Sequence, residues 1–351
     1  MRVLHVISSL EIGGAQRLLS DLLPLQKMMG VDVSLLVLKA EDSDFTRKVL
    51  DAGVPIISLN ATTFRNPLLA IKLRGVIKNF NIVHAHLVHA LYLCSIAARC
   101  LDVKLVYTEH STSNNRRGKS FMRPIEKWIY GRYEKLISIS EQTQTALQGW
   151  LQSSDKRFVV IHNGVDTEAF SSIRQKKIPN SLIMVSRFAS SKDQETVIRA
   201  MKMLNEDVTV RFVGDGEKLE HCKQMARDCG VENRVSFLGA RSDVSNLVAE
   251  SYIGIQSSNW EGFGLTVVEM MAAGLPVIAT DVDGLKQVVE GAGVLFPVGD
   301  EVALAHQVNH ILNDKIFYDS LSEASKKRAE KYDISMTAQQ YVNCYKQICN
   351  G

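Results

Sequence analysis

Residues 253–280, IGIQSSNWEGFGLTVVEMMAAGLPVIAT, show most clearly how this chain folds. This stretch begins with a short apolar run, passes through a glycine-containing loop into an apolar helical segment, and ends with a second short apolar run. A strand, a crossover helix and another strand in this order form a right-handed unit in which the two strands are parallel. Both runs are mostly apolar, which is typical of strands covered on both faces. The stretch therefore predicts part of a doubly wound α/β sheet.

The same alternation continues along almost the whole chain. In the first half it predicts strands at 2–7, 31–38, 54–59, 82–86, 104–108, 136–139 and 157–161, with helices such as 15–29 and 67–79 between them. A second series of strands is predicted at 181–186, 208–213, 235–238, 253–257, 276–280 and 293–295. Residues from about 300 to 349 then predict two or three helices without a strand. The pattern indicates two parallel, doubly wound sheets.

A change of pattern separates the two series. Residues 164–180, GVDTEAFSSIRQKKIPN, are polar and have no apolar period. We therefore expect a Rossmann-like domain over 1–165 and a second one from 166 to about 335. Ligands of open α/β sheets bind beyond the carboxyl ends of the strands. Two such sheets facing each other would form an interdomain cleft at those ends, so residues just after strands are the candidates for a site.

Composition and charge narrow the class of protein. The chain is 46% hydrophobic and 23% charged, an ordinary balance for a soluble globular protein. No apolar run approaches the roughly 18 residues that a membrane-spanning helix needs. Six cysteines without a CxxC pair argue against a disulfide framework and a zinc site, so we expect a cytoplasmic protein. Residues 1–165 carry 21 Lys and Arg against 13 Asp and Glu, whereas the remainder carries 20 against 25. The basic and acidic halves are expected to meet different partners.

The segment 261–269, EGFGLTVVE, follows a predicted strand directly and opens a helix. Gly262 and Gly264 would let the backbone approach a ligand closely, and the free N–H groups at the start of the helix suit a phosphate. Glu269 lies among apolar neighbours inside that helix, where a carboxylate needs partners. Sugar hydroxyls would serve. The structural alternative is a buried ion pair or a hydrogen bond to a neighbouring loop.

Two cations follow another strand. Arg187 ends the run SLIMVSR, and Lys192 opens the next helix, where a basic residue opposes the helix dipole. Arg can bind a pyrophosphate bidentately while Lys acts as a point charge. Solvated surface charges are the alternative. Gly13 and Gly14 follow the first strand and could admit a phosphate, although such a pair is often only a tight turn.

Histidines lie at the carboxyl ends of two predicted strands of the first half. His110 precedes the polar loop STSNN and is a candidate for catalysis or hydrogen bonding. His84 and His86 lie on one strand face, with His89 soon after, a spacing seen in metal sites. No nearby carboxylate or cysteine completes a ligand set, so we predict no metal.

Residues 116–135, RRGKSFMRPIEKWIYGRYEK, combine seven basic residues with interleaved aromatic and apolar ones. Such segments suit the surface of an anionic membrane. A solvated helix that packs its apolar side inward is the alternative. Nucleic acid is not expected, because no recognition motif accompanies the charge.

Taken in order, these motifs resemble the retaining glycosyltransferases of family four, which have the GT-B fold. The resemblance covers essentially the whole chain. It is carried by GGA at 13–15, IHNGVD at 161–166, VSR at 185–187 with Lys192, VGDGE at 213–217, FLG at 237–239, and above all Glu261-x7-Glu269 followed by AGLPVIAT at 273–280. Each motif is weak alone, but the ordered set is specific. One departure is Asp193, which follows Lys192 where glycine is usual.

The resemblance implies a role for each matching residue. Arg187 and Lys192 would hold the pyrophosphate of a nucleotide-sugar donor and stabilise the departing diphosphate, and Glu269 would bind the ribose. Glu261 and His110 would contact the transferred sugar, which makes these two residues and the cationic pair the catalytic candidates. The remaining donor contacts would come from Gly13, Gly14, Leu238, Gly262, Phe263, Gly264, Leu265 and Thr266. The helix at 336–351 would cross back to the first domain.

The resemblance also implies a reaction. The enzyme would transfer a sugar to a glycan or lipid-linked acceptor with retention at the anomeric carbon, without a metal or other cofactor, in bacterial surface polysaccharide assembly. The first domain would bind the acceptor, at the inner face of the cytoplasmic membrane if residues 116–135 contact lipid. A sugar-nucleotide epimerase, an inverting GT-B enzyme and a non-catalytic nucleotide-sugar-binding subunit are the competing interpretations. A nicotinamide dehydrogenase is disfavoured because the frame at 11–16 is not GxGxxG.

Overall fold

The structure is a computed structural model that describes residues 1–350 except 12, 65, 67, 113–115 and 118. The chain divides into two compact units, one made of Met1–Gly164 with Ile334–Gly351 and the other of Val165–Asp333. The C-terminal helix therefore belongs to the first unit, although the chain reaches it from the second. Part of the polar loop predicted after His110 lies outside the described residues.

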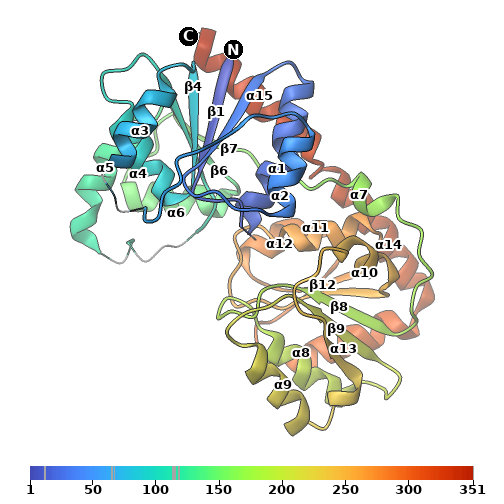
Figure 1. The fold of residues 1–351 in the computed structure, drawn as a ribbon. Helices are drawn as coiled ribbons and strands as arrows, with labels where there is room; N and C mark the ends of the chain where they lie inside the picture. The colour runs from blue at the N-terminus through green and yellow to red at the C-terminus, as the bar shows by residue number, and fades with distance from the viewer. Residues whose placement is uncertain (12, 65, 67, 113–115, 118, 351) are drawn as a thin grey trace. The chain divides into compact units, whose positions relative to one another are not determined.

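The first unit contains a sheet of seven parallel strands in the order β3-β2-β1-β4-β5-β6-β7 (Figure 1). The strands are β1 Arg2–Ile7, β2 Asp32–Val37, β3 Ile56–Ser58, β4 Ile82–His86, β5 Lys104–Glu109, β6 Lys135–Ser138 and β7 Phe158–Val160. The helices are α1 Gly14–Met28, α2 Asp44–Asp51, α3 Leu68–Ile77, α4 Leu87–Ala97, the short η1 Ser120–Met122, α5 Arg123–Tyr130, α6 Glu141–Leu151 and α15 Ile334–Asn350. The strand order reverses at β1 and β4, which makes the ends of these two strands a preferred place for a ligand.

The second unit repeats this architecture with six parallel strands in the order β10-β9-β8-β11-β12-β13. These are β8 Ser181–Val185, β9 Thr209–Val213, β10 Val235–Phe237, β11 Ile253–Gln256, β12 Val277–Thr280 and β13 Val294–Phe296. Helical segments are α7 Glu168–Ser171, α8 Gln194–Ala200, η2 Met201–Met203, α9 Leu219–Asp228, η3 Glu232–Arg234, α10 Val244–Glu250, α11 Leu265–Ala272, α12 Asp283–Val289, α13 Glu301–Asn313 and α14 Lys315–Glu330. Here the order reverses between β8 and β11.

The predicted fold is confirmed: every predicted strand is present, with ends that differ by one or two residues, and both sheets are parallel. Helices α13, α14 and α15 form the tail, as the sequence indicated. Within the described residues, none of the helices combines the length and the apolar character that a membrane span requires.

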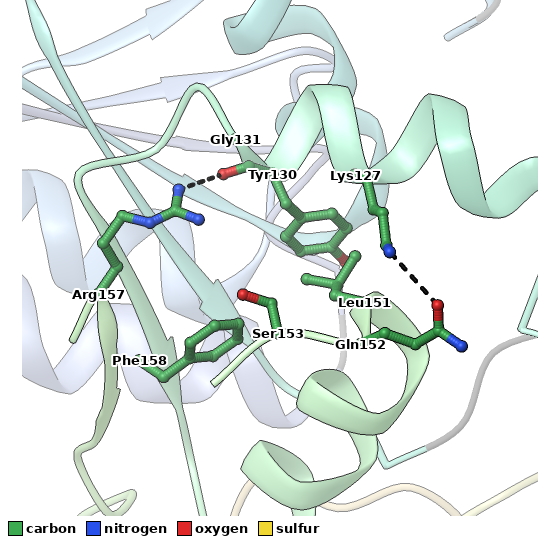
Figure 2. Close-up of a pocket in the computed structure, with 8 residues that line it drawn as sticks. All are labelled: Lys127, Tyr130, Gly131, Leu151, Gln152, Ser153, Arg157 and Phe158. Atoms are coloured by element: carbon green, nitrogen blue, oxygen red, sulfur yellow. Dashed lines mark hydrogen bonds between the residues drawn. The ribbon is translucent and has the colours of Figure 1, made fainter. Parts of the chain in front are cut away.

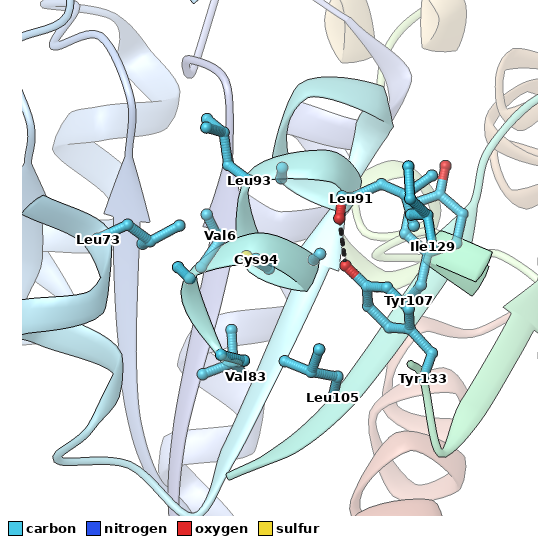
Figure 3. Close-up of a cluster of buried hydrophobic side chains, with 14 of the residues drawn as sticks. Val6, Leu73, Val83, Leu91, Leu93, Cys94, Leu105, Tyr107, Ile129 and Tyr133 are labelled. Atoms are coloured by element: carbon cyan, nitrogen blue, oxygen red, sulfur yellow. Dashed lines mark hydrogen bonds between the residues drawn. The ribbon is translucent and has the colours of Figure 1, made fainter. Parts of the chain in front are cut away.

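Alternation along the strands builds two cores in the first unit. On β1, Leu4 and Val6 belong to one buried cluster, whereas Val3 and Ile7 belong to another. Because side chains of a strand point alternately to opposite faces, the two clusters lie on opposite faces of the sheet. Figure 3 shows the first cluster, in which Cys94 lies among aliphatic side chains and the Tyr133 hydroxyl donates to the Leu91 carbonyl over 2.6 Å. The second cluster packs the sheet against α1 and α15.

Candidate functional site

Two of the predicted residues meet at the switch point of the second sheet, and a third lies on the loop that carries one of them. Lys192 follows β8 and Glu261 follows β11, and their side chains form an ion pair that is largely shielded from solvent. The Lys192 ammonium also lies 3.4 Å from the Ser258 hydroxyl. Arg187 begins the same loop after β8 and is exposed. Two cations and a carboxylate therefore share the place where an α/β sheet binds its ligands.

Asp193, the departure from the family pattern, has a structural role. Its carboxylate accepts a hydrogen bond from the Thr196 backbone N–H over 3.1 Å and thereby caps α8. Its second oxygen accepts from the Ser257 hydroxyl at 3.2 Å, and its N–H donates to the Ser257 carbonyl at 3.1 Å. Asp193 thus fastens the loop after β8 to the loop after β11, and it places Lys192 beside Glu261.

The glycines of the VGDGE motif provide space for the loop that carries Arg187. Gly214 has φ of +139°, and a Cβ there would lie 2.0 Å from the Ser186 carbonyl oxygen. Gly216, with φ of +151°, would meet the Phe188 carbonyl oxygen at 2.4 Å. The two backbones are joined by a hydrogen bond from the Phe188 N–H to the Asp215 carbonyl at 2.9 Å. Only glycine fits such close approaches at these dihedrals.

Leu238 belongs to the same group of strand ends. It follows β10, it is partly buried, and its N–H donates to the Phe212 carbonyl over 2.9 Å. The next residue, Gly239, accepts from the Gly214 N–H at 2.8 Å. The predicted base-pocket residue is therefore attached through Gly214 to the loop that carries Arg187.

The segment from Gly262 to Thr266 forms the turn into α11. Gly264 is the cap of this helix, with φ of +87°, a region that L side chains rarely adopt. The Gly262 N–H donates a hydrogen bond of 3.1 Å to the carboxylate of the preceding residue, Glu261. The Thr266 hydroxyl donates to Gln256 at the end of β11 over 2.9 Å, which holds the start of the helix.

The other members of this segment differ in exposure. Phe263 is buried and packs edge-on against Tyr332, with ring centroids 5.3 Å apart. Its side chain therefore has a packing role. Leu265 is partly buried. Glu269 lies one turn further along α11 and is only 1% exposed, as its apolar neighbours predicted.

In the first unit, Gly13 and Gly14 form the turn between β1 and α1. Gly13 has an extended backbone, with φ of 176°, so its dihedral does not require glycine. A Cβ at Gly13 would meet the mobile end of Gln16. Gly14 is exposed at the first position of α1. The structural interpretation, a tight strand-to-helix turn, explains the pair without excluding backbone contact to a phosphate.

His110 lies just beyond β5 and belongs to a cluster of four histidines. His86 Nδ1 lies 3.1 Å from His110 Nε2, and His86 Nε2 lies 3.0 Å from His5 Nδ1. His84 stacks on His86 with ring centroids 4.2 Å apart. Burial lowers the pKa of His5 and of His110 to about 4, and it places the pKa values of His84 and His86 well below the ordinary range. The four rings are therefore neutral at physiological pH.

The sequence pattern places His84 and His86 on one strand face, but it does not reveal His5, which lies about eighty residues earlier. The available signal was its position inside the apolar run VLHVI, because a buried polar side chain requires partners. His5, His84 and His86 are close enough to hold a metal ion. Each of their six ring nitrogens, however, already has a hydrogen-bonding partner within the protein. A metal would have to displace these bonds. His89 contacts Phe64 and Ser8 instead.

The basic segment 116–135 uses several of its cations internally. Arg116 pairs with the buried Glu126 at 2.8 Å, and Arg117 pairs with Glu109 at 2.8 Å. Arg123 stacks over Trp150 at 4.9 Å. The same segment leaves three large apolar side chains in solvent, namely Phe121 at 70%, Ile125 at 50% and Trp128 at 53% exposure. The alternative interpretation required a helix that packs its apolar side inward. These three exposed side chains show that the apolar side is not fully buried.

A hollow of about 280 Å³ lies beside this segment, at the junction of α5, α6 and β7 (Figure 2). Its two cations are already engaged: Arg157 donates to the Tyr130 carbonyl over 3.2 Å and pairs with Asp155, while Lys127 reaches Gln152 at 3.4 Å. None of the predicted site residues lines it. The hollow is therefore separate from the predicted site.

Comparison with known families agrees with the geometry of both units. Residues 12–169 match the model of glycosyltransferase family 4, and residues 165–328 match that of the glycosyl transferases group 1. The two matches together extend across nearly the whole chain. The chain belongs to glycosyltransferase family four. It is a glycosyltransferase with two Rossmann-like sheets, and the resemblance inferred from its motifs is confirmed.

Several relatives of this glycosyltransferase are similar over almost their full length. It is 26% identical to the phosphatidyl-myo-inositol mannosyltransferase of Mycobacterium leprae, over 97% of this chain and 94% of that one. It is 23% identical to the O-antigen biosynthesis glycosyltransferase WbnH of Escherichia coli, over 99% and 98%. Among solved structures, Anabaena Alr3699/HepE in complex with UDP and glucose superposes with a TM-score of 0.87 at 23% identity, covering 99% of this chain and all of that one.

Proposed function

We propose that this glycosyltransferase transfers a sugar, with retention and without a metal, from a nucleotide-sugar donor to a glycan or lipid-linked acceptor in surface polysaccharide assembly. The observation that carries the proposal is the Lys192–Glu261 ion pair at the switch point of the second sheet, with Arg187 on the same loop. Cations at this place can neutralise the negative charge that develops on a nucleoside diphosphate as the bond to the donor sugar breaks. HepE, found with UDP, makes a uridine nucleotide the first donor class to test.

Each unit has its own part in the proposal. In the second unit, Glu269 binds the ribose, the 262–266 turn offers N–H groups to sugar and phosphate, and Leu238 lines the base pocket. In the first unit, Gly13, Gly14 and His110 complete the phosphate and sugar contacts. Because Glu261 pairs with Lys192, a diphosphate bound at this ammonium would compete with the carboxylate and leave it available to the sugar.

The test begins with donor binding. A thermal-shift series with UDP, GDP, ADP and their sugars should raise the melting temperature for one nucleotide, since a ligand that binds only the native state stabilises it. Arg187→Ala should weaken that nucleotide about tenfold to a hundredfold, because a charge-assisted bond contributes about 1.5–3 kcal/mol. Arg174→Ala, at an exposed arginine of the same unit, is the matched control. Equal affinities in the two variants would refute the diphosphate site.

Product analysis tests three further parts of the proposal: retention, independence from a metal and transfer to an acceptor. NMR of the first-formed product should show the anomeric configuration of the donor, and a chelator should leave the rate unchanged. Inversion at the anomeric carbon would favour an inverting enzyme, and turnover of the donor without acceptor would favour an epimerase. Donor binding without transfer to any glycan or lipid-linked acceptor would favour a non-catalytic subunit.

The acceptor side of the proposal includes contact with an anionic membrane through residues 116–135. Phe121, Ile125 and Trp128 recur at helical spacing and are exposed, a pattern that suits insertion among lipid headgroups. Replacing all three by Ser should abolish co-sedimentation with anionic vesicles while leaving the fold intact. Ile316→Ser, at an 84% exposed apolar residue of the second unit, is the control. Unchanged sedimentation of the triple variant would remove the membrane from the proposal.

A further inference from the structure

The histidine cluster forms a directed chain of hydrogen bonds that ends at His110. A neutral imidazole has one N–H and one bare nitrogen, so a hydrogen bond at one nitrogen determines what the other can do. In a row of neutral rings, the first partner therefore sets the tautomer of every following ring. All four rings are neutral near pH 7 because burial lowers their pKa values.

The row begins at Gln26 on α1. Its side-chain oxygen lies 2.9 Å from His5 Nε2, and a carbonyl oxygen only accepts, so Nε2 of His5 carries the hydrogen. Tyr345 of α15 supports this polarity. Its hydroxyl lies 2.5 Å from His84 Nδ1 and 3.3 Å from His5 Nε2. Donation of the single hydroxyl hydrogen to His84 Nδ1 leaves the Tyr345 oxygen as an acceptor toward His5, which is the same polarity that Gln26 sets.

The polarity then passes from ring to ring. Nδ1 of His5 is bare and accepts from His86 Nε2 over 3.0 Å. Nδ1 of His86 is consequently bare and accepts from His110 Nε2 over 3.1 Å. The last ring, His110, has its hydrogen on Nε2 and its lone pair on Nδ1. Among the described residues, Nδ1 of His110 has no hydrogen-bonding partner of its own.

We infer that His5 and His86 are positioning residues, which, starting from Gln26, hold His110 as the Nε2–H tautomer so that its Nδ1 accepts a hydrogen bond from a sugar hydroxyl. The inference rests on the proposed sugar-binding role of His110. It adds a direction to that role: a bare nitrogen selects a hydroxyl donor and disfavours a substrate that offers only an acceptor there. This row of hydrogen bonds could not be predicted from local sequence, because its members come from α1, β1, β4 and the end of β5.

Three variants test the row of hydrogen bonds from Gln26 to His110. His86→Leu removes the nitrogen that accepts from His110, while the leucine side chain fills the buried position of the ring. His86→Asn restores an acceptor, because the Asn side-chain oxygen lies near the position of Nδ1. His84→Leu is the matched control: His84 is equally buried and stacks on His86, and its ring nitrogens bond Tyr345 and Thr108. The bond from His5 Nε2 to the Gln26 oxygen, which sets the polarity, is retained in this variant.

The tautomer is measured directly on the full chain with nitrogen-15 histidine, because protonated and bare ring nitrogens have different chemical shifts. A His110→Gln sample assigns the His110 signals. At neutral pH, the native protein, His86→Asn and His84→Leu should show His110 with a protonated Nε2 and a bare Nδ1. His86→Leu should show both tautomers. A charged or Nδ1-protonated His110 in the native protein, or an unchanged signature in His86→Leu, would overturn the inference.

Transfer kinetics supply a second measurement. His86→Leu should lower kcat/KM about tenfold, the equivalent of one lost hydrogen bond, and His86→Asn should recover most of it. His84→Leu should lose thermal stability without this loss of kcat/KM. A loss of similar size in His86→Asn and His84→Leu would assign the cluster a purely structural role. The spectra need no substrate, so absence of transfer by the native protein would refute the proposed function and leave the tautomer assignment to be judged by itself.

Discussion

At the scale of single residues, the site depends on charges that would be costly to bury alone. Lys192 and Glu261 offset each other while they are partly shielded from solvent. Glu269 is more deeply placed, at 1% exposure inside α11. A carboxylate in such a position offers only acceptors, which suits the paired hydroxyls of a ribose.

Replacing Glu269 by Gln tests this role. The change keeps the size of the side chain but removes the charge, so charge-assisted bonds to the ribose are lost. We expect donor affinity to fall about tenfold or more, as measured by calorimetry. Glu290→Gln, at an exposed carboxylate of the same unit, should bind normally. Unchanged affinity of the Glu269 variant would exclude a ribose contact.

At the scale of elements, the second unit holds the loops after its strands in place by backbone contacts between strand ends. Gly214 after β9 packs on Ser186, at the end of β8, and bonds Gly239 beyond β10. Asp193 joins the loop after β8 to the loop after β11. The position of Arg187 therefore depends on contacts between the loops that surround it.

Gly214→Ala should disturb this arrangement, because a methyl group 2.0 Å from the Ser186 carbonyl oxygen must displace the backbone beside Arg187. We expect a loss of about 3 kcal/mol in the free energy of unfolding together with weaker donor binding. Gly230→Ala is the matched control: its φ is +66°, but open space surrounds the added carbon. That variant should lose only about 1 kcal/mol and keep its affinity. Denaturant titrations and calorimetry distinguish the two results.

At the scale of the whole molecule, buried histidines should make the stability of the first unit depend on pH. The cluster of buried histidines belongs entirely to the first unit, where His5 and His110 have pKa values near 4 and His84 and His86 lie well below the ordinary value of 6.5. An unfolded chain binds protons at these groups below pH 6.5. The native unit does not bind them until the pH approaches 4. Stability must therefore fall as the pH drops through that window.

We expect the first unit to lose about 2 kcal/mol or more near pH 5 from His5 alone, and little above the ordinary histidine pKa. A variant with Trp128 and Trp260 changed to Phe retains Trp150, which is buried in the first unit and reports its unfolding by fluorescence. Urea titrations near pH 5 and at neutral pH give the difference in the free energy of unfolding. Equal midpoints at the two pH values would contradict neutral buried histidines.

Much of this protein could be predicted from sequence. The apolar runs specified both parallel sheets because strands covered on two faces are predominantly apolar. The ordered motifs indicated the family. Residues that follow strands, such as Arg187, Lys192, Glu261 and His110, could be placed because the carboxyl ends of parallel strands share one edge. The burial of Glu269 followed from its apolar neighbours alone.

Only the tertiary structure decided which of these residues meet. The Lys192–Glu261 pair joins side chains 69 positions apart, and the His5–His86 bond joins side chains 81 positions apart. Local sequence has no period at such separations, because strand order, rather than chain order, brings these residues together. The tertiary structure also assigned Asp193 to a cap and Arg116 and Arg117 to buried acids, since the partners that satisfy a charge come from whichever element packs beside it.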